Sequence, residues 1–150
     1  GPTSQRTIIT DNRVSRTTYG VWLVHDIQNV TSEHCNIVIK SNLFSGVTFY
    51  GVRIQSYVNG AEVSDNTFIG PMDFPTSEVY GIYVHPNSVK HGIRDNTFLN
   101  LGANAVPIYL GGVTDTVTFP WSTIQSVNGH QMDGNVVNGP RSNNFVGNSY

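Results

Sequence analysis

Arg53, Tyr83 and His85 are the residues of this 150-residue chain whose types and spacing are best suited to chemistry. Each lies in or just after a short segment of alternating apolar residues, which is typical of a β-strand. We expect the three side chains to point outward from neighbouring strands. Arg53 would neutralise an anion, and Tyr83 or His85 would exchange a proton. A base beside a cation is what β-elimination next to a sugar carboxylate requires, so these are candidate catalytic residues of a lyase.

Two loop carboxylates, Asp73 and Glu78, suggest a different reaction. Hydrolysis of a glycosidic bond uses two carboxyl groups roughly 5–9 Å apart. No Asp or Glu falls at an outward position of the strands that carry Arg53 and Tyr83, so nearby carboxylates must come from loops. Asp73 with Glu78 is the best pair, although charged loop residues are commonly just solvated. The loop carboxylates are Asp26, Glu33, Asp73, Glu78 and Asp115.

Aromatic and amide residues near these positions are candidates for holding a sugar. Aromatic rings offer flat apolar faces to sugar rings, while Arg, Gln and His supply directed hydrogen bonds. Exposed strands also favour Tyr and Trp through sheet packing alone. We expect Trp22, Gln55 and Tyr109 to bind substrate, together with Trp121 from a long loop that otherwise packs onto the fold. The expected outward positions are Trp22 and Val24, Arg53 and Gln55, Tyr83 and His85, and Pro107 and Tyr109.

An asparagine-centred motif that occurs five times must position these strands. Each copy has an apolar residue three positions before the Asn and another two positions after it. The residues Asn12, Asn42, Asn66, Asn96 and Asn135 are 30, 24, 30 and 39 residues apart. Such a repeat predicts a solenoid. We interpret the Asn residues as structural, because Asn at a bend tolerates left-handed backbone angles and can hydrogen-bond the neighbouring coil.

A second repeat, a Tyr-Gly step followed by alternating apolar residues, lies between the first. From Asn42 to Gly51 is 9 residues and from Gly51 to Asn66 is 15, which gives a basic coil of 24 residues. The copies are Tyr19–Leu23, Tyr50–Ile54, Tyr80–Val84 and a degenerate Asn104–Ile108. The residues expected inside are Ile37, Ile39, Phe44, Val52, Ile54, Val63, Phe68 and Phe98.

Coils of this length, with Asn at one bend and aliphatic or Phe stacks inside, resemble the right-handed parallel β-helix of the pectate-lyase-like superfamily. The chain is most similar to a fragment of a bacteriophage tailspike or polysaccharide lyase, and the resemblance covers roughly residues 7–146. It implies an all-β, right-handed single-stranded parallel β-helix of about five coils. It also implies an extracellular or virion-tail location and a homotrimer like those of phage spikes. Outward apolar residues that could form the subunit contact are Leu43, Ile69, Leu99 and Val136.

Insertions interrupt the repeat on both sides of the Gly-containing strands. They lie within Ile69–Val79, near His25–Cys35 and through Gly111–Val127. Loops beside one set of strands form walls, and the outer face of those strands becomes the floor of a groove. Four coils at about 4.8 Å spacing span roughly 14 Å, which accommodates a short stretch of an extended polymer.

The composition of the chain narrows the classes of molecule that it could bind. A net charge of −2 argues against nucleic acid, and no apolar run reaches the length of a membrane span. One Cys excludes internal disulfides, and the five His residues show no zinc spacing, so we expect no metal and no cofactor. We expect a single domain over residues 1–150, part of a longer protein, with Gly1-Pro2 as a tag remnant. It would bind, and in an enzyme depolymerise, an acidic polysaccharide. The alternative is a non-catalytic structural or trimerisation solenoid of a phage tail.

Overall fold

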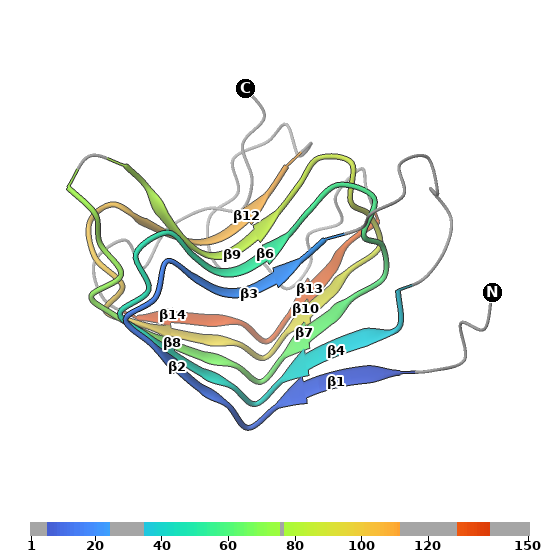
Figure 1. The fold of residues 1–150 in the computed structure, drawn as a ribbon, viewed down its shortest axis with the longest axis horizontal. Helices are drawn as coiled ribbons and strands as arrows, with labels where there is room; N and C mark the ends of the chain where they lie inside the picture. The colour runs from blue at the N-terminus through green and yellow to red at the C-terminus, as the bar shows by residue number, and fades with distance from the viewer. Residues whose placement is uncertain (1–5, 25–34, 76, 112–128, 139–150) are drawn as a thin grey trace.

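The computed structural model describes residues 6–24, 35–75, 77–111 and 129–138, and all regular elements in them are β-strands. No helix in this part of the chain could span a membrane. The strands follow one another as the chain winds around a common axis (Figure 1). They are β1 (Thr7–Thr10), β2 (Arg13–Ser15), β3 (Tyr19–Leu23), β4 (Ile37–Lys40), β5 (Leu43–Ser45), β6 (Tyr50–Ile54), β7 (Glu62–Ser64), β8 (Thr67–Ile69), β9 (Val79–Val84), β10 (Gly92–Arg94), β11 (Thr97–Leu99), β12 (Ala105–Leu110), β13 (Gln131–Asp133) and β14 (Val136–Asn138).

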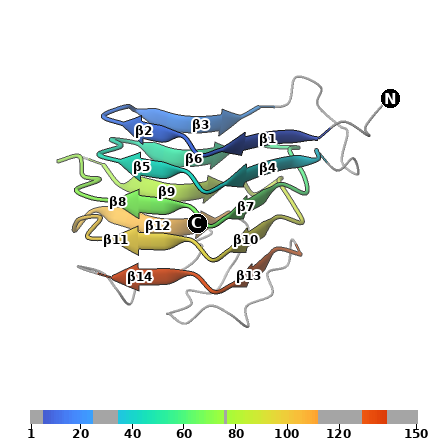
Figure 2. The same cartoon turned by 90° about the horizontal axis from the view of Figure 1, so that it is seen from below.

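Three parallel sheets run along the axis, and each takes one strand from each coil. Sheet A has the order β1-β4-β7-β10-β13, sheet B has β2-β5-β8-β11-β14 and sheet C has β3-β6-β9-β12. Every strand pairs in parallel with its equivalent in the next coil, so equivalent residues form columns (Figure 2). The expected right-handed parallel β-helix of about five coils is confirmed.

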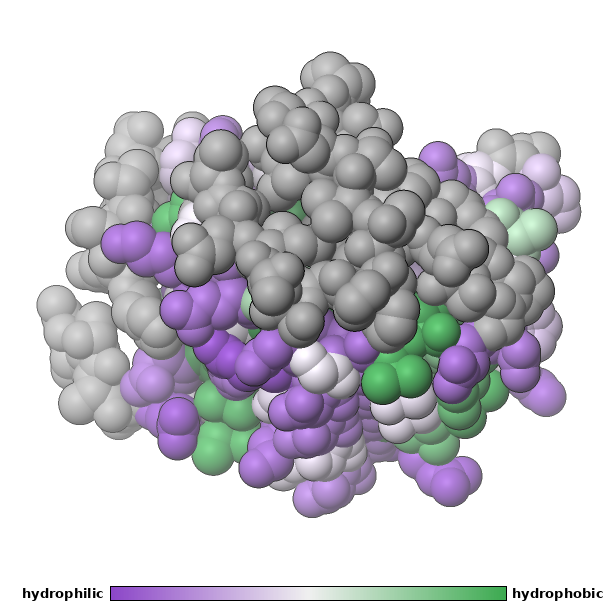
Figure 3. Space-filling model, turned by 180° about the vertical axis from the view of Figure 1, so that it is seen from behind, coloured by the Kyte–Doolittle hydropathy of each residue, from purple (hydrophilic) through white to green (hydrophobic). Residues whose placement is uncertain are grey.

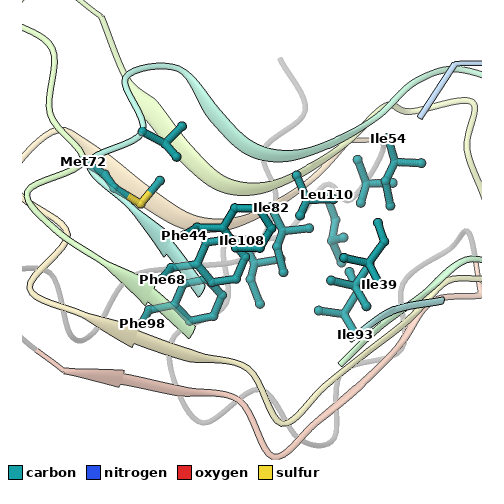
Figure 4. Packing of buried hydrophobic residues seen from close by; sticks show 14 of the residues in the cluster. Ile39, Phe44, Ile54, Phe68, Met72, Ile82, Ile93, Phe98, Ile108 and Leu110 are labelled. Carbon is teal, nitrogen blue, oxygen red and sulfur yellow. The ribbon is translucent and has the colours of Figure 1, made fainter. Parts of the chain in front are cut away.

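The core consists of the apolar columns that the repeats predict. Phe44, Phe68 and Phe98 are fully buried and stack with ring centroids 4.8 Å apart (Figure 4). Aliphatic columns from sheets A and C face them, and Ile37 is only half-buried. The aliphatic residues with no exposed surface include Ile39, Val63 and Ile93 from sheet A, and Val52, Ile54, Ile82 and Ile108 from sheet C.

The Asn residues form one hydrogen-bonded column at the bend between sheets A and B. The backbone N–H and Nδ2 of Asn42 both donate to Asn66 Oδ1 at 3.0 Å, and Asn66 donates in the same way to Asn96. The structural interpretation of these residues is therefore confirmed. The left-handed angle, however, belongs to the residue before each Asn rather than to the Asn itself. These preceding residues are Asp11, Ser41, Asp65, Asp95 and Gly134.

Three of these left-handed residues are acidic. Asp11, Asp65 and Asp95 are exposed on the outside of the bends. Figure 3 shows hydrophilic residues along the lower rim of the molecule, with hydrophobic patches set apart on either side. The bends are therefore solvated, and those of the first three coils line an open hollow of about 440 Å³.

Sheet C needs Gly at the point where its strands pass over the Phe stack. A Cβ at Gly51 would lie 2.6 Å from Gly81 O and 2.7 Å from the Phe68 ring. The predicted fourth copy is displaced by two residues, because Val106 pairs with Tyr80 and Ile108 with Ile82. Pro107, not Ala105, is thus level with Gly81.

Candidate functional site

The outer face of sheet C carries the predicted floor residues in one column. Trp22 pairs with Arg53, Arg53 with Tyr83, and Tyr83 with Tyr109. The register brings Trp22, Arg53 and Tyr83 together on adjacent coils, as the alternation predicts. Tyr109 is shifted relative to the expectation, since it is level with Tyr83 rather than with His85.

Arg53 is enclosed by aromatic rings. Its Cζ lies 4.8 Å from the Tyr50 ring centroid, 5.0 Å from that of Trp22 and 5.9 Å from that of Tyr83. Cations are attracted to aromatic faces at such distances. No carboxylate among the described residues pairs with the guanidinium, and its buried Nε has no hydrogen-bond partner there. The site therefore contains a fixed positive charge that no described side chain neutralises.

Trp22 is the most accessible aromatic residue of this column, with 47% of its surface exposed. Its indole Nε1 donates a hydrogen bond to Gln55 Oε1 at 2.9 Å, and its ring stacks on Tyr19 with centroids 5.2 Å apart. These contacts fix the ring orientation before any ligand arrives. Gln55 therefore orients the Trp22 ring, besides any direct contact of its own with a ligand.

The two tyrosines of the column stack on each other instead of facing solvent. The Tyr83 and Tyr109 rings are parallel within 1° at a centroid distance of 4.9 Å, and Tyr109 is only 8% exposed. Tyr109 is thus far less exposed than alternation predicts, and Pro107 is buried as well, while the assignment of Tyr109 to substrate binding stays a prediction. The stacked rings leave mainly their edges for a ligand.

Tyr50 belongs to the site, although strict alternation places it inside with Val52 and Ile54. Its ring contacts the Arg53 guanidinium and the edge of Tyr83. Burial raises the pKa of Tyr50, with Arg53 acting in the opposite direction, so its hydroxyl stays protonated at neutral pH. The available signal was Gly51, since a Gly inside a strand often marks a bend that breaks alternation.

His85 follows β9 and is half-buried. Its Nδ1 accepts a hydrogen bond from the Asn87 backbone N–H at 3.1 Å. Burial, and to a smaller extent Arg53, lowers the pKa of His85, so the ring is neutral at pH 7. A neutral ring that accepts through Nδ1 carries its proton on Nε2, where it can donate a hydrogen bond.

The insertion before β9 rises beside sheet C as a wall (Figure 1). Phe74 and Ser77 form an antiparallel bridge in it, and Phe74 is 45% exposed. Asp73 accepts a hydrogen bond from the Asn104 backbone N–H at 3.4 Å, and both Asp73 and Glu78 are exposed. The carboxylates are therefore on the wall and not on the floor.

Several predicted residues lie outside the described part of the chain. They include Trp121 and most of the loops near His25–Cys35 and through Gly111–Val127. The carboxylates in this group are Asp26, Glu33 and Asp115.

A second polar cluster, buried at the turns before sheet A, contains His91 and His130. Their rings stack with centroids 5.2 Å apart, and each is 1% exposed. Nδ1 of His91 accepts from the Ala61 N–H at 2.9 Å, and Nδ1 of His130 accepts from the His91 N–H at 3.1 Å. Ser88 Oγ lies 2.5 Å from Nε2 of His91. These histidines work as neutral acceptors that fix successive coils.

Acid should therefore destabilise the fold through His130, because burial lowers its pKa to about 4. A histidine whose pKa is lower when folded than its unfolded value of about 6.5 binds fewer protons in the native state. Its contribution is complete above pH 6.5 and is lost as the pH falls toward 4. We expect urea unfolding to give about 2 kcal/mol less stability at pH 5 than at pH 7.5. His130→Asn keeps an acceptor for the His91 N–H and should flatten this dependence, whereas identical pH profiles would contradict the assignment.

Comparison with known proteins adds one finding. The family model NosD, described as periplasmic copper-binding protein, matches residues 2–150. No curated protein and no solved structure matches the chain. Among the described residues, no three His, Cys, Asp or Glu side chains gather in a way that could hold a metal ion.

Proposed function

The chain belongs to the NosD family and is a periplasmic β-helix domain of that type, and on this premise we propose that it binds an acidic glycan on the outer face of sheet C. The periplasm lies outside the cytoplasm, in coarse agreement with the extracellular location expected from the sequence. A virion-tail location is not part of this proposal.

The fixed and exposed ring of Trp22 is the observation that carries the proposal. Half of its surface is accessible, yet Gln55 and Tyr19 hold it in one orientation. An aromatic face that is ordered in advance binds a sugar ring at a smaller entropic cost than a free side chain.

Arg53 is the reason for an acidic ligand. Its charge is enclosed by Trp22, Tyr50 and Tyr83, and no described carboxylate neutralises it. A sugar carboxylate beside Trp22 would pair with this guanidinium through charge-assisted hydrogen bonds. The neutral His85 would add a donor through Nε2.

Cleavage of the glycan is a further part of the proposal that needs its own assay. Arg53 could stabilise an enolate-like anion, and Tyr83 and His85 would exchange protons, as a lyase requires. A hydrolytic route would use Asp73 and Glu78. New absorbance at 235 nm would identify β-elimination, reducing ends alone would identify hydrolysis, and neither signal would leave a binding domain.

Copper, which the family description names, does not fit the described residues. Nδ1 of His91 and of His130 each accept backbone N–H groups, and Met72 and Met132 are core residues with at most 3% exposure. Copper sites are built from imidazole and sulfur ligands that converge on one point. Among the described residues, no three His, Cys, Asp or Glu side chains gather as a metal site would need, and the two methionines are buried in the core, so we derive no function through copper.

The binding proposal is tested by alanine variants of the floor. Trp22→Ala and Arg53→Ala should each weaken binding to a responsive acidic polysaccharide at least about tenfold, because each removes a main contact worth about 1.4 kcal/mol or more. Arg13→Ala, an exposed arginine of β2 away from the sheet C face, is the matched control. Unchanged affinity of both floor variants in calorimetry would contradict the proposal.

A structural or trimerisation solenoid is the second candidate, and one observation bears on it. Val136 is 41% exposed on sheet B, where Leu43 lies in the same column. Thr67 and Thr97 separate the two in that column, so the apolar surface is interrupted. Light scattering that shows a homotrimer, together with no glycan response, would favour this candidate.

A further inference from the structure

A groove of about 870 Å³ lies on the outer face of sheet A, separate from the Trp22 column. Its lining comes from all five strands of that sheet and from the turns before them. One outward column runs Ile8, Val38, Glu62, Gly92 and Gln131, and the next runs Thr10, Lys40, Ser64, Arg94 and Asp133. Five strands at about 4.8 Å spacing give a surface roughly 19 Å long.

Gly92 leaves room for an ion pair that lies across the groove. A Cβ at this position would lie 2.1 Å from Nη1 of Arg94 and 2.2 Å from Oε2 of Glu62. The Arg94 side chain can therefore fold across Gly92, where Nη1 donates to Glu62 at 2.6 Å and Nε lies 3.2 Å from Asp133. The hydrogen bond that Arg94 donates to Glu62 raises the pKa of Arg94, so the guanidinium stays charged within this network.

The charge of the groove is opposite to that of the whole chain. Its lining includes Arg6, Lys40, Lys90 and Arg94 but only one carboxylate, Glu62, while the chain carries −2. Arg94 is paired, whereas Arg6, Lys40 and Lys90 form no ion pair with a described residue. These cations come from different coils, so one small anion could not reach them all. The arrangement fits an extended ligand with repeated negative charges.

The floor between the cations is partly apolar. Ile8 is 54% exposed, and Ile37 and Val38 are half-buried beside it. The described lining has no Phe, Tyr or Trp on which a nucleic-acid base could stack, a contact on which single-strand binding depends. Sugar rings have apolar C–H faces that suit such a floor, and a polyphosphate has none.

We propose that this groove is a second binding site, which takes an extended carboxylated glycan along the helix axis. Its carboxylates pair with Arg6, Lys40 and Lys90 while its rings lie over Ile8 and Val38. This site does not depend on the Trp22 column, because the two sets of residues belong to different sheets. Two sites on different faces would let one molecule link two polymer chains.

The test uses unesterified oligogalacturonate in a Trp22→Ala/Arg53→Ala background, in which the sheet C face is disabled. Calorimetry should show residual binding that weakens as salt rises, since surface ion pairs are screened. Adding Lys40→Glu and Lys90→Glu should weaken it at least about tenfold. Adding Arg13→Glu, a single charge reversal on β2 outside the groove, should change it less than about twofold, and each lysine reversal made alone should weaken it more than Arg13→Glu does. Thermal unfolding checks that all variants are folded.

Three results with the oligogalacturonates would overturn the inference. They are absence of residual oligogalacturonate binding, equal affinity of the Lys40→Glu/Lys90→Glu and Arg13→Glu variants, and equally tight binding of the fully methyl-esterified oligomer. Inorganic polyphosphate of matched charge serves as a second probe. If it binds as tightly and loses as much affinity in the lysine variants, the groove recognises charge alone and the assignment to a glycan is wrong. Loss of the sheet C function without loss of this binding would separate the two proposals.

Discussion

Asn66→Ala is expected to lower the free energy of unfolding by about 3 kcal/mol, because it leaves several buried polar groups without partners. Asn66 Oδ1 accepts from the backbone N–H and Nδ2 of Asn42, and its Nδ2 donates to Ile39 O and Asn96 Oδ1. All of these groups lie at a bend with almost no access to water, as Asn66 and Asn96 have no exposed surface. Urea unfolding at pH 7.5 measures the effect.

Asn12→Ala is the matched control, because Asn12 occupies the same column in the first coil and is exposed. It donates to Asn42 Oδ1 but sits where water can replace the lost contacts. We expect a loss below about 1 kcal/mol. Equal losses for Asn12→Ala and Asn66→Ala would show that the column does not act as a buried network.

Gly51→Ala is expected to destabilise the fold by about 3 kcal/mol, at the upper end of overpacking costs. The new methyl group would lie 2.6 Å from the Gly81 carbonyl oxygen and 2.7 Å from the Phe68 ring. A backbone oxygen in a paired strand cannot move aside without disturbing the next coil. Thermal or urea unfolding of the variant measures the cost.

A double-mutant cycle with Phe68→Leu separates the ring contact from the backbone contact. A smaller side chain at 68 makes room for part of the methyl group, so Gly51→Ala should cost less in the Phe68→Leu background than in the wild type. Strict additivity of the two changes would contradict the proposed clash with the ring and leave only the backbone term.

The repeats predicted the fold well because each coil of a solenoid packs the same pattern of apolar residues against the next coil, and this pattern repeats along the sequence. The apolar residues on either side of each Asn became the Ile39 and Phe44 columns, which are buried in the inner coils and half-buried in the first coil at Ile9 and Val14. The position of the left-handed residue was missed by one, since Asn and the Asp or Ser before it both tolerate that conformation. Periodicity sets which residues face inward, but not which residue of a bend carries the strained angle.

The site was predicted only in part, and the reasons are local. Alternation placed Arg53 and Tyr83 on the outer face of sheet C, where they lie. It failed for Tyr50, because alternation breaks at Gly51. Tyr109 lies in the outer column as predicted, but level with Tyr83 instead of His85, because Pro107 takes the Gly position of the fourth coil. The orientation of the rings, which turns Tyr83 and Tyr109 against each other, depends on contacts between coils and is absent from the sequence pattern.

The groove on sheet A could not have been found from the sequence. Its cations come from strands and turns of separate coils, and only the register brings Lys40 and Arg94 to the same outer column. In the sequence, Gly92 is indistinguishable from an ordinary strand residue. Only the structure shows that the Arg94 side chain lies over it.

Trp22 itself offers the most direct measurement of whether the sheet C face binds an acidic glycan. The chain has two Trp residues, so Trp121→Phe leaves Trp22 as the sole indole reporter. This variant would be titrated with capsular, lipopolysaccharide, pectic and alginate polysaccharides while tryptophan emission is recorded and calorimetry follows binding. We predict a saturable change in emission with at least one acidic glycan, and its loss in the Arg53→Ala background. Calorimetric binding that leaves Trp22 emission unchanged, or no binding of the wild-type chain across the panel, would contradict the assignment.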